Sequence, residues 1–325
     1  MFFFLLALAL IFDFLNGFHD SSNIVATVIT SGALRPRQAL VTAAICEFLG
    51  PFLFGVAVAT TVGEGLLNNE AIGVAVVTAA LFAAVVWNLI TWYIGLPSSS
   101  SHALIGGLLG AAILSNGLGV VRIPGLVKII LALLISPPLG LIAGFIVMRL
   151  TLFAVRKSPP SVSNAFRRLQ VVTLVGLALS HGTNDGQKTM GVIAMGLLTA
   201  GYLNRFYVPM WVIAISATAI ALGTSLGGWR LIKTLGGKIF HIRPVHGFTS
   251  QVAGAAVILG AAFLGGPVST TQVMSSAIMG AGAAERLSKV RWLVLRDMAV
   301  AWILTIPLTA TLSAVAWQIV SWFTH

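Results

Sequence analysis

Two aspartates lie in similar seven-residue stretches, one in each half of the chain. Asp20 lies in 17–23 and Asp185 in 182–188, and both stretches are rich in amide and hydroxyl side chains. A carboxylate inside an apolar segment is costly, so its presence in both copies indicates function. Carboxylate, amide and hydroxyl oxygens suit hard cations such as sodium. The expected cation ligands are Asp20, Asn23, Asp185, Asn184, Ser21 and Thr183.

Two runs of hydroxyl side chains follow a proline, at 98–101 after Pro97 and at 269–271 after Pro267. At a helix start, such a run offers hydroxyls together with free backbone N–H groups. That set suits a tetrahedral oxyanion, which accepts many hydrogen bonds at once. The alternative is that one residue of each run only caps a helix. The expected anion ligands, two of them from the second aspartate stretch, are Ser98, Ser99, Ser100, Ser101, Ser269, Thr270, Thr271, Gln187 and Lys188.

Further ionisable residues lie in the same apolar segments. Lys188 contacts the anion or pairs with an acid, and Glu47 is a candidate cation ligand, proton carrier or partner of Lys188. Asp13 precedes Asp20 by about two helical turns, on a similar face, and can extend the site. Histidines titrate near neutrality, or they are polar residues of a cavity wall. The candidates for coupling or for support of the site are Glu47, Asp13, His19, His102 and His181.

The composition requires a membrane to position these residues. Of 325 residues, 58% are apolar and 8% are charged, and the mean hydropathy is +0.99. A soluble domain carries about 25% charged residues, so a soluble enzyme, a disordered chain and a coiled coil are excluded. We predict an all-α polytopic membrane protein. The net charge of +11 would suggest nucleic acid in a soluble protein, but basic cytoplasmic loops explain it here, and no nucleic-acid partner is expected.

Ten apolar stretches are long enough to enter or cross a bilayer; they lie at 2–33, 39–61, 71–96, 98–116, 122–155, 169–200, 207–228, 246–266, 268–284 and 291–323. The linkers rich in Lys and Arg are 34–38, 156–168, 229–245 and 285–291, and the poor ones are 62–70, 117–122 and 201–206. Counted over ten passes, all the basic linkers fall on one side. The positive-inside rule then places both termini outside the cytoplasm.

The paired motifs divide the chain into two repeats of about five helical segments each. The first repeat covers 1–155, the second covers 169–325, and a basic cytoplasmic linker at 156–168 joins them. Because five is odd, the second repeat is inverted relative to the first. Many secondary transporters follow this plan and bind their substrate on broken helices near the membrane midplane, between the repeats.

The segments that carry the hydroxyl runs have two possible geometries. The pairs 71–96 with 98–116 and 246–266 with 268–284 are either two full passes each or re-entrant hairpins that stop at mid-membrane. Irregular backbone at that depth is tolerated where it lines a cavity or is buried in protein. Our hypothesis is that two hairpins enter from opposite faces and that their tips meet around one site.

Other classes of function fit the residues less well. An intramembrane hydrolase needs one activated nucleophile, but the hydroxyl cluster is duplicated, and the duplicate of His102 is Gln272. Neither Gly-x-Ser-x-Gly nor His-Glu-x-x-His occurs, so no enzyme is expected. An anion channel remains the alternative from another class, although the buried acids favour coupled transport. Residue types alone leave phosphate against sulfate and sodium against proton open.

Four stretches in order, 12–23, 97–107, 180–191 and 267–277, resemble the paired motifs of the inorganic phosphate transporter (PiT) family. The family pattern Gly-Ala-Asn-Asp-x-x-Asn maps onto Gly17, Asp20, Asn23, Gly182, Asn184 and Asp185. The chain departs from it at Phe18-His19, at Lys188 in place of the final Asn, and at Gln272, where relatives often have histidine.

The resemblance implies phosphate uptake that is coupled to sodium in some members and to protons in others. We expect a secondary active transporter that imports inorganic phosphate across the inner (plasma) membrane by cation symport, with sodium favoured. A proton-coupled phosphate or sulfate permease is the alternative. No cofactor is expected besides the coupling ions. The expected protein partners are a PhoU-like regulatory protein and a second copy of the chain in a homodimer.

Overall fold

The part of the chain that the structure describes is almost entirely helical. The structure is a computed structural model, and it describes all residues except 69–72, 97, 238–241 and 323–325; the side chains of 237, 294, 295 and 297 are also outside the description. Pro97 of the first hydroxyl run therefore lies outside the described residues. Among the described residues the β-type pairing is confined to one isolated bridge, between Leu67 and Val121.

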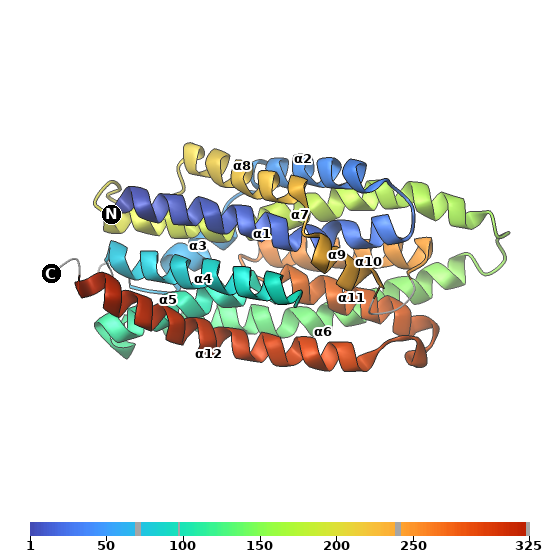
Figure 1. The fold of residues 1–325 in the computed structure, drawn as a ribbon. Helices are drawn as coiled ribbons and strands as arrows, with labels where there is room; N and C mark the ends of the chain where they lie inside the picture. Colours follow the sequence, from blue (N-terminus) through green and yellow to red (C-terminus); the bar gives the residue numbers. More distant parts are fainter. Residues whose placement is uncertain (69–72, 97, 238–241, 323–325) are drawn as a thin grey trace.

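The two halves of the chain have the same order of helices. The first half contains α1 (Phe2–Thr30), α2 (Pro36–Phe54), α3 (Ala57–Thr60) with a π-helical turn (Thr61–Gly65), α4 (Val74–Ile94), α5 (Ser100–Asn116) and α6 (Ile123–Ala154). The second contains α7 (Val162–Thr199), α8 (Met210–Leu226), α9 (Trp229–Gly237), α10 (Pro244–Phe263), α11 (Thr270–Glu285) and α12 (Trp292–Trp322). In Figure 1, α1 and α7 run in opposite directions, as the inverted repeat requires, and both termini lie at one end of the bundle.

Most of these helices match the predicted apolar stretches. Among the described residues, six helices are long and apolar enough to cross a bilayer, namely α1, α2, α4, α6, α10 and the Met298–Trp322 part of α12. The pair α8 and α9 would be a seventh span, bent by 69° at its break. The bundle is thus a multi-pass membrane protein. Exposed leucine and isoleucine side chains on α6, such as Leu134 and Ile142, fit contact with lipid.

The boundaries differ from the predicted ones at two helix breaks. The predicted stretch 39–61 is interrupted at Gly55, and α8 ends just before Gly227. Both glycines have positive φ, of 80° and 72°, which glycine adopts without a Cβ clash. After the second break, part of the predicted linker 229–245 forms α9. α9 is amphipathic, with Leu231 and Leu235 buried, and its basic residues made it look like a linker in the sequence.

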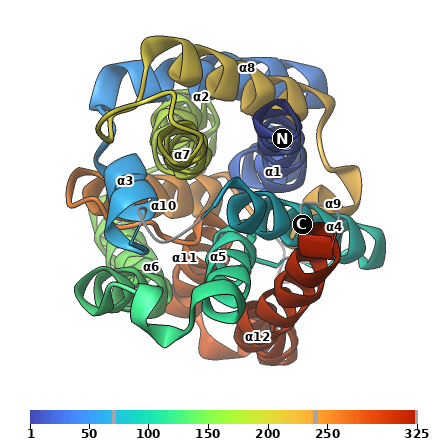
Figure 2. The same cartoon turned by 90° about the vertical axis from the view of Figure 1, so that its left-hand side faces the viewer.

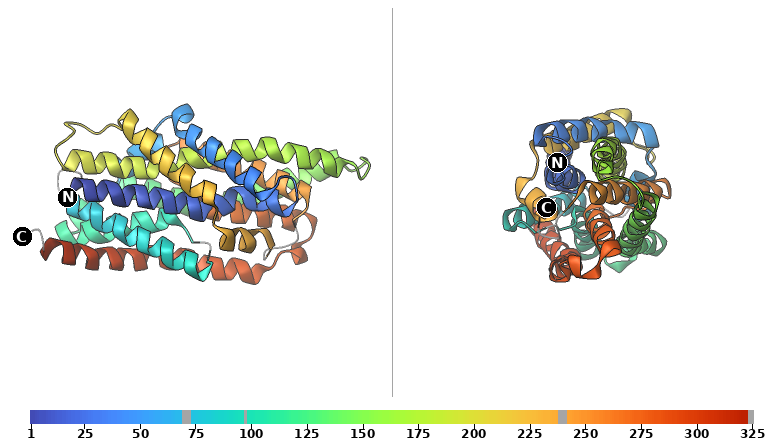
Figure 3. Two further views of the ribbon diagram at one scale, coloured as in Figure 1. Left: turned by 45° about the horizontal axis from the view of Figure 1, so that its top comes forward. Right: turned by 90° about the vertical axis from the view of Figure 1, so that its right-hand side faces the viewer.

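Two hairpins enter the bundle from opposite ends. Figures 1 and 3 show that α4 and α5 enter from the end that holds the termini, whereas α10 and α11 enter from the other end. Their tips are in contact, because the Ser101 hydroxyl donates a hydrogen bond of 3.0 Å to the Val268 carbonyl. The Gln272 Nε2 atom also lies 3.4 Å from His102 Nδ1. The expectation that the tips of two hairpins meet after entering from opposite ends therefore agrees with the structure.

α1 and α7 lie inside the bundle beside the hairpins. Figure 2, viewed along the bundle, shows α2 and α8 across one side and α6 and α12 across the opposite side. Helices of one repeat cross helices of the other repeat at close range. A Cβ on Gly17 of α1 would come within 2.0 Å of the Ile220 carbonyl oxygen on α8, and one on Gly182 of α7 within 2.2 Å of the Glu47 carbonyl oxygen on α2. The first glycine of each aspartate motif thus allows its helix to pack directly against the other repeat.

Candidate functional site

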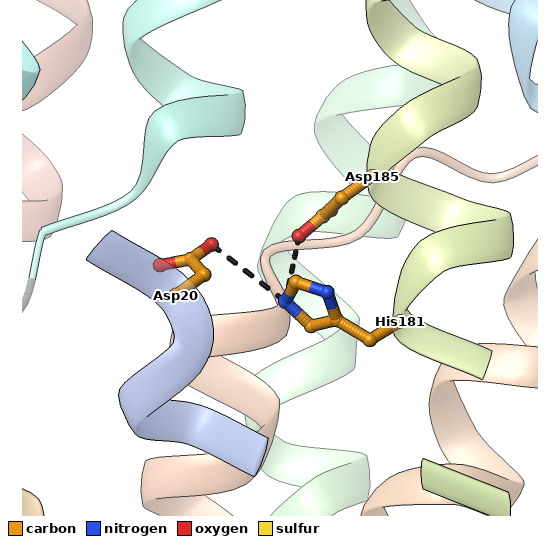
Figure 4. A group of neighbouring side chains, drawn as sticks. All are labelled: Asp20, His181 and Asp185. Atoms are coloured by element: carbon orange, nitrogen blue, oxygen red, sulfur yellow. Dashed lines mark ion pairs between the residues drawn. The ribbon is translucent and has the colours of Figure 1, made fainter. Parts of the chain in front are cut away.

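The two motif aspartates meet at the centre of the bundle, on the helices α1 and α7. Asp20 and Asp185 are both about 1% exposed or less. Figure 4 shows that both carboxylates approach the same ring nitrogen of His181. One ligand atom from each of these three residues lies within 4.8 Å of the other two. This spacing allows one cation to contact all three side chains.

The tip of the second hairpin supplies hydroxyls to both carboxylates. Thr270 Oγ1 lies 2.7 Å from Asp185 Oδ2 and 3.3 Å from Asp20 Oδ2. Thr271 Oγ1 donates to Asp20 Oδ1 at 3.0 Å and accepts a 3.0 Å hydrogen bond from the Asn23 amide. The hydroxyl run and the aspartate motifs, which the sequence treats as separate patterns, therefore form a single site.

Lys188 joins three parts of this site. Its ammonium group pairs with Asp185, one turn earlier on α7. It also donates to Ser101 Oγ at 2.6 Å and to the Val268 carbonyl at 2.7 Å. An ammonium group has three donors, so all three are used. Of the two sequence-based alternatives for Lys188, the structure contains the ion pair and also brings the lysine to both hairpin tips.

His181 connects the aspartates to a third buried acid. Its Nε2 atom lies 3.0 Å from Asp185 Oδ2 and 3.9 Å from Asp20 Oδ2. Its Nδ1 atom lies 2.5 Å from Glu47 Oε1, and all of these side chains are buried. His19 is a further neighbour, with Nδ1 2.9 Å from Asp20 Oδ1. The site thus contains three carboxylates and three nitrogen-bearing side chains within ion-pair distance of one another's neighbours.

The two hydroxyl runs also contain the helix caps that the sequence left as an alternative. Ser99 accepts a hydrogen bond from the His102 backbone N–H and caps α5; Ser269 accepts one from the Gln272 backbone N–H and caps α11. Ser98 donates to Thr91 Oγ1 within its own hairpin, at 3.0 Å. Ser100, the first residue of α5, is buried at the tip. Capping and site contacts are therefore divided among neighbouring residues of each run.

Several predicted ligands hold the helix framework instead of facing the carboxylates. Asn184 donates to the Gly266 carbonyl at 3.1 Å and so fixes the second hairpin. Gln187 donates to the Gly55 carbonyl at 2.6 Å, at the break between α2 and α3. Ser21 accepts from the Gly228 N–H at 2.9 Å, at the break between α8 and α9, while the Thr183 hydroxyl donates back to its own helix. Each motif thus satisfies backbone groups at the broken helix of the other repeat.

A cleft beside the second hairpin carries positive charge. It has a volume of about 620 Å³ and its lining includes Arg122, Lys128, Glu64 and Gly265. Lys128 donates to the Thr61 hydroxyl at 3.2 Å. Gly265 directly precedes Gly266, whose carbonyl accepts the hydrogen bond from Asn184. The cleft therefore reaches the backbone of the hairpin that forms the site, and sequence patterns gave no sign of it.

The comparisons with known proteins agree with this geometry. Residues 16–313 match the family described as "Phosphate transporter family". The chain is 46% identical over 317 residues to the probable low-affinity inorganic phosphate transporter of Bacillus subtilis, covering 96% of this chain and 95% of that protein. It is 44% identical over 315 residues to the protein of the same description from Rhizobium meliloti, covering 96% and 94%.

A solved structure has the same fold. It is described as "The sodium-dependent phosphate transporter"; the TM-score is 0.89 at 26% sequence identity, and the match covers 99% of both chains. The family match includes both aspartate motifs and both hairpins, so the resemblance inferred from four short stretches is confirmed. The chain belongs to the phosphate transporter family.

Proposed function

We propose that this protein is a secondary active transporter that imports inorganic phosphate together with sodium. The observation that carries the proposal is the joining of hydroxyl-rich hairpin tips to a pair of buried carboxylates through Thr270 and Lys188. The printed descriptions of the relatives, which name inorganic phosphate, and of the solved structure, which names sodium, support it.

The phosphate would be held at the two hairpin tips. Ser101, Thr270 and Thr271 bring their hydroxyls to one place, and Lys188 brings an ammonium donor. The backbone N–H groups at the starts of α5 and α11 add further donors and the positive ends of the helix dipoles. Such a set suits the many acceptor positions of a phosphate oxyanion.

Electrostatics gives a reason for coupling. Two like unit charges about 4 Å apart repel by about 4 kcal/mol at an effective dielectric constant of 20. A phosphate anion beside Asp20 and Asp185 would meet both carboxylates in a buried site. Sodium bound to these carboxylates, with Asn23 and nearby hydroxyls as further ligands, removes that repulsion. The anion and the cation therefore stabilise each other, and neither crosses efficiently alone.

Lys188 would change partner during the cycle. The ammonium group now neutralises Asp185 and contacts both hairpin tips. Sodium at Asp185 would take over the neutralisation and release the ammonium toward phosphate. The hairpins enter from opposite ends, so opening one tip at a time would expose the site alternately to each side. In the orientation proposed from the basic linkers, the termini face outward and 156–168 faces the cytoplasm of a prokaryotic cell.

Proton coupling is the second candidate. The observation that favours it is His181, which lies within ion-pair distance of Glu47, Asp185 and Asp20 at once. A proton moved through this group would neutralise the same carboxylates that sodium neutralises in the first proposal. Sulfate is the alternative anion, because it is also tetrahedral.

Uptake of radiolabelled phosphate into proteoliposomes tests the proposal. We expect phosphate to accumulate above its outside concentration when an inward sodium gradient is imposed, and sulfate to compete weakly. Liposomes without protein and liposomes with equal sodium on both sides are the controls. Accumulation driven by an inward proton gradient alone would select the second candidate. Phosphate movement that only follows its own gradient would indicate a channel and would refute both.

A further inference from the structure

An apolar groove runs along the outside of the bundle between α6 and α10. Its volume is about 400 Å³, and on α6 its lining follows one helical face through Leu131, Ile135 and Leu139. These three side chains are about half exposed, so the groove is open along its length. Figure 2 shows α6 and α10 as neighbours at one edge of the bundle. Because both helices are candidate membrane spans, the groove faces the lipid chains.

The apolar groove continues into the charged cleft of Arg122 and Lys128. The linings of the two cavities have Lys128 and Leu264 in common. Lys128 is the charged residue among the described residues that line the groove. It lies within two turns of the start of α6, which begins at the end of the bundle that holds the termini (Figure 1). The joined space therefore has a cationic end near one membrane surface and an apolar end deeper in the bilayer.

The cationic end has charge to spare for an anion. Lys128 donates to the Thr61 hydroxyl at 3.2 Å, and Arg122 donates to the backbone carbonyl of Glu64 at 3.2 Å. Both acceptors are neutral, and both cationic side chains are exposed. The Glu64 carboxylate is the one acidic group among the described residues of the cleft lining. Two cations and one acid leave a single positive charge, which matches an anion with one negative charge.

The apolar groove has the dimensions of a lipid chain in one leaflet. Lys128 and Leu139 are eleven residues apart on α6, a distance of about 16 Å at about 1.5 Å per residue. Half of a hydrocarbon core about 30 Å thick is about 15 Å. Over this length, the volume of about 400 Å³ corresponds to a width of about 5 Å, half the diameter of a helix. The groove is therefore long enough for one leaflet and too narrow for a helix of another chain.

We propose that the apolar groove and the charged cleft together bind one anionic phospholipid. Its phosphodiester, with one negative charge, lies at Lys128 and Arg122, and one acyl chain lies between α6 and α10. Dissolved phosphate would use the cleft and leave the groove, whereas a zwitterionic lipid would use the groove and leave the cations without a net counter-charge. Where anionic lipid is absent, the same cations face water and attract dissolved phosphate. The inference goes beyond the proposed function and does not depend on the solute that is carried.

The acyl chain would lie against the tip of the second hairpin. Gly266 and Val268 both belong to the lining of the apolar groove. Their carbonyl groups accept hydrogen bonds from Asn184 and Lys188, so the same short segment contacts the groove and the central site. A chain packed in the groove therefore supports this segment from the membrane side. We expect anionic lipid to raise the midpoint of thermal unfolding by several degrees more than zwitterionic lipid does.

Native mass spectrometry of the delipidated protein in detergent tests the site directly. The probes are dioleoyl phosphatidylglycerol, dioleoyl phosphatidylcholine with the same chains, and dihexanoyl phosphatidylglycerol with the same headgroup. We expect one dioleoyl phosphatidylglycerol per chain to bind about tenfold or more tighter than phosphatidylcholine, the attraction expected from two cations near a membrane surface. The short-chain lipid should bind weakly, because it cannot fill the apolar groove.

Two variants remove the two ends of the site separately. Lys128→Gln with Arg122→Gln should abolish the preference for phosphatidylglycerol over phosphatidylcholine. Gly260→Leu should lower the retention of both long-chain lipids by about tenfold, because leucine occupies the apolar groove. A Cβ on Gly260 meets no atom within 4 Å, so the leucine enters the groove without a backbone clash.

Each variant has a matched control elsewhere in the chain. Arg156→Gln with Lys157→Gln removes two exposed cations of the linker between the repeats. Gly176→Leu adds the same side chain on α7, at a position outside the groove lining where a Cβ also meets no atom within 4 Å. Both controls should keep the wild-type preference for phosphatidylglycerol.

Several outcomes would overturn the lipid site. Equal binding of the two long-chain lipids to the wild-type protein would do so, as would equal binding of the long-chain and short-chain phosphatidylglycerols, which would assign the cleft to the anion alone. A Gly260→Leu protein that keeps its lipid but loses a second copy of the chain would assign the groove to a subunit contact. If Gly260→Leu does not fold, an unchanged lipid preference in the Lys128→Gln, Arg122→Gln variant would overturn the site equally.

Discussion

Lys188 of the second repeat donates a 2.6 Å hydrogen bond to Ser101 at the tip of the first hairpin. The same ammonium group pairs with Asp185. A single positive charge therefore links the place where we expect phosphate to the place where we expect sodium. Any change at Lys188 should be felt at both places, but in opposite directions.

Replacing Lys188 by Gln should separate the two affinities. Phosphate loses a charge-assisted donor, worth about 1.5–3 kcal/mol, so its KM should rise by about tenfold or more. Sodium no longer competes with the ammonium at Asp185, so the sodium concentration for half-maximal uptake should fall. Uptake kinetics in proteoliposomes at varied phosphate and sodium measure both. Lys188→Arg retains the charge and is the control, and a change of both parameters in the same direction would contradict the partner exchange.

Neutralising either motif aspartate should abolish sodium-driven uptake. Asp20→Asn and Asp185→Asn keep the side-chain size but remove the charge that holds the cation. Asp185→Asn also leaves Lys188 without its buried partner, a loss of about 3–5 kcal/mol in comparable pairs. The double variant Asp185→Asn with Lys188→Met also removes the unpaired buried ammonium group. It should recover thermal stability but not transport, and sodium-driven uptake in either single variant would refute the assignment of the cation site.

Residues of the two hydroxyl runs should differ in how strongly their replacement lowers phosphate uptake. Thr270→Val keeps the shape of the side chain but removes the hydroxyl that lies at both carboxylates, and we expect uptake to fall by about tenfold or more. Ser98 instead bonds to Thr91 within its hairpin, so Ser98→Ala should change uptake by less than about threefold. Equal losses in initial uptake rate for the two variants would contradict the assignment of Thr270 to the site.

The pairing of the aspartates and the meeting of the hairpins could be predicted from the sequence. Asp20 and Asp185 occupy matching places in repeats of opposite orientation, and an inverted repeat places matching residues at equal distances from the membrane midplane. The same argument places Ser101 and Thr270 at matching hairpin tips. Duplication therefore gave the three-dimensional relationship that a single copy of each motif cannot give.

The roles of individual motif residues could not be predicted. Ser21 and Gln187 were expected to act as ligands, but they bond to backbone at helix breaks in the opposite repeat, beside Gly228 and Gly55. Motif spacing defines the face of one helix, whereas these partners depend on how two helices cross. Glu47 meets His181 for the same reason, since no spacing in the sequence relates α2 to α7.

The close helix crossings should make the first glycine of each motif sensitive to size. Gly17→Ala and Gly182→Ala place a Cβ within 2.2 Å or less of a backbone carbonyl in the other repeat. Overpacking of this kind costs about 1–3 kcal/mol, so the midpoint of thermal unfolding in detergent should fall by several degrees. Gly176→Ala, on the same helix as Gly182, is the matched control because its Cβ would meet no atom within 4 Å. It should be neutral or slightly stabilising, and an equal loss in all three variants would contradict the crossing geometry.

The cleft at Arg122 and Lys128 should attract phosphate before it reaches the hairpin tips. Its two cations are opposed by Glu64 alone among the described acidic residues of the lining. Replacing both cations by Gln should raise the KM for phosphate by about threefold at low ionic strength, because charged walls raise the local concentration of an oppositely charged solute. The difference from wild type should vanish near 0.5 M of a choline salt, where the Debye length falls to about 4 Å. The double variant Arg156→Gln with Lys157→Gln removes two exposed cations of the linker between the repeats and serves as the charge-matched control. An increase in KM that does not depend on salt would mean that these residues act through packing rather than through their charge.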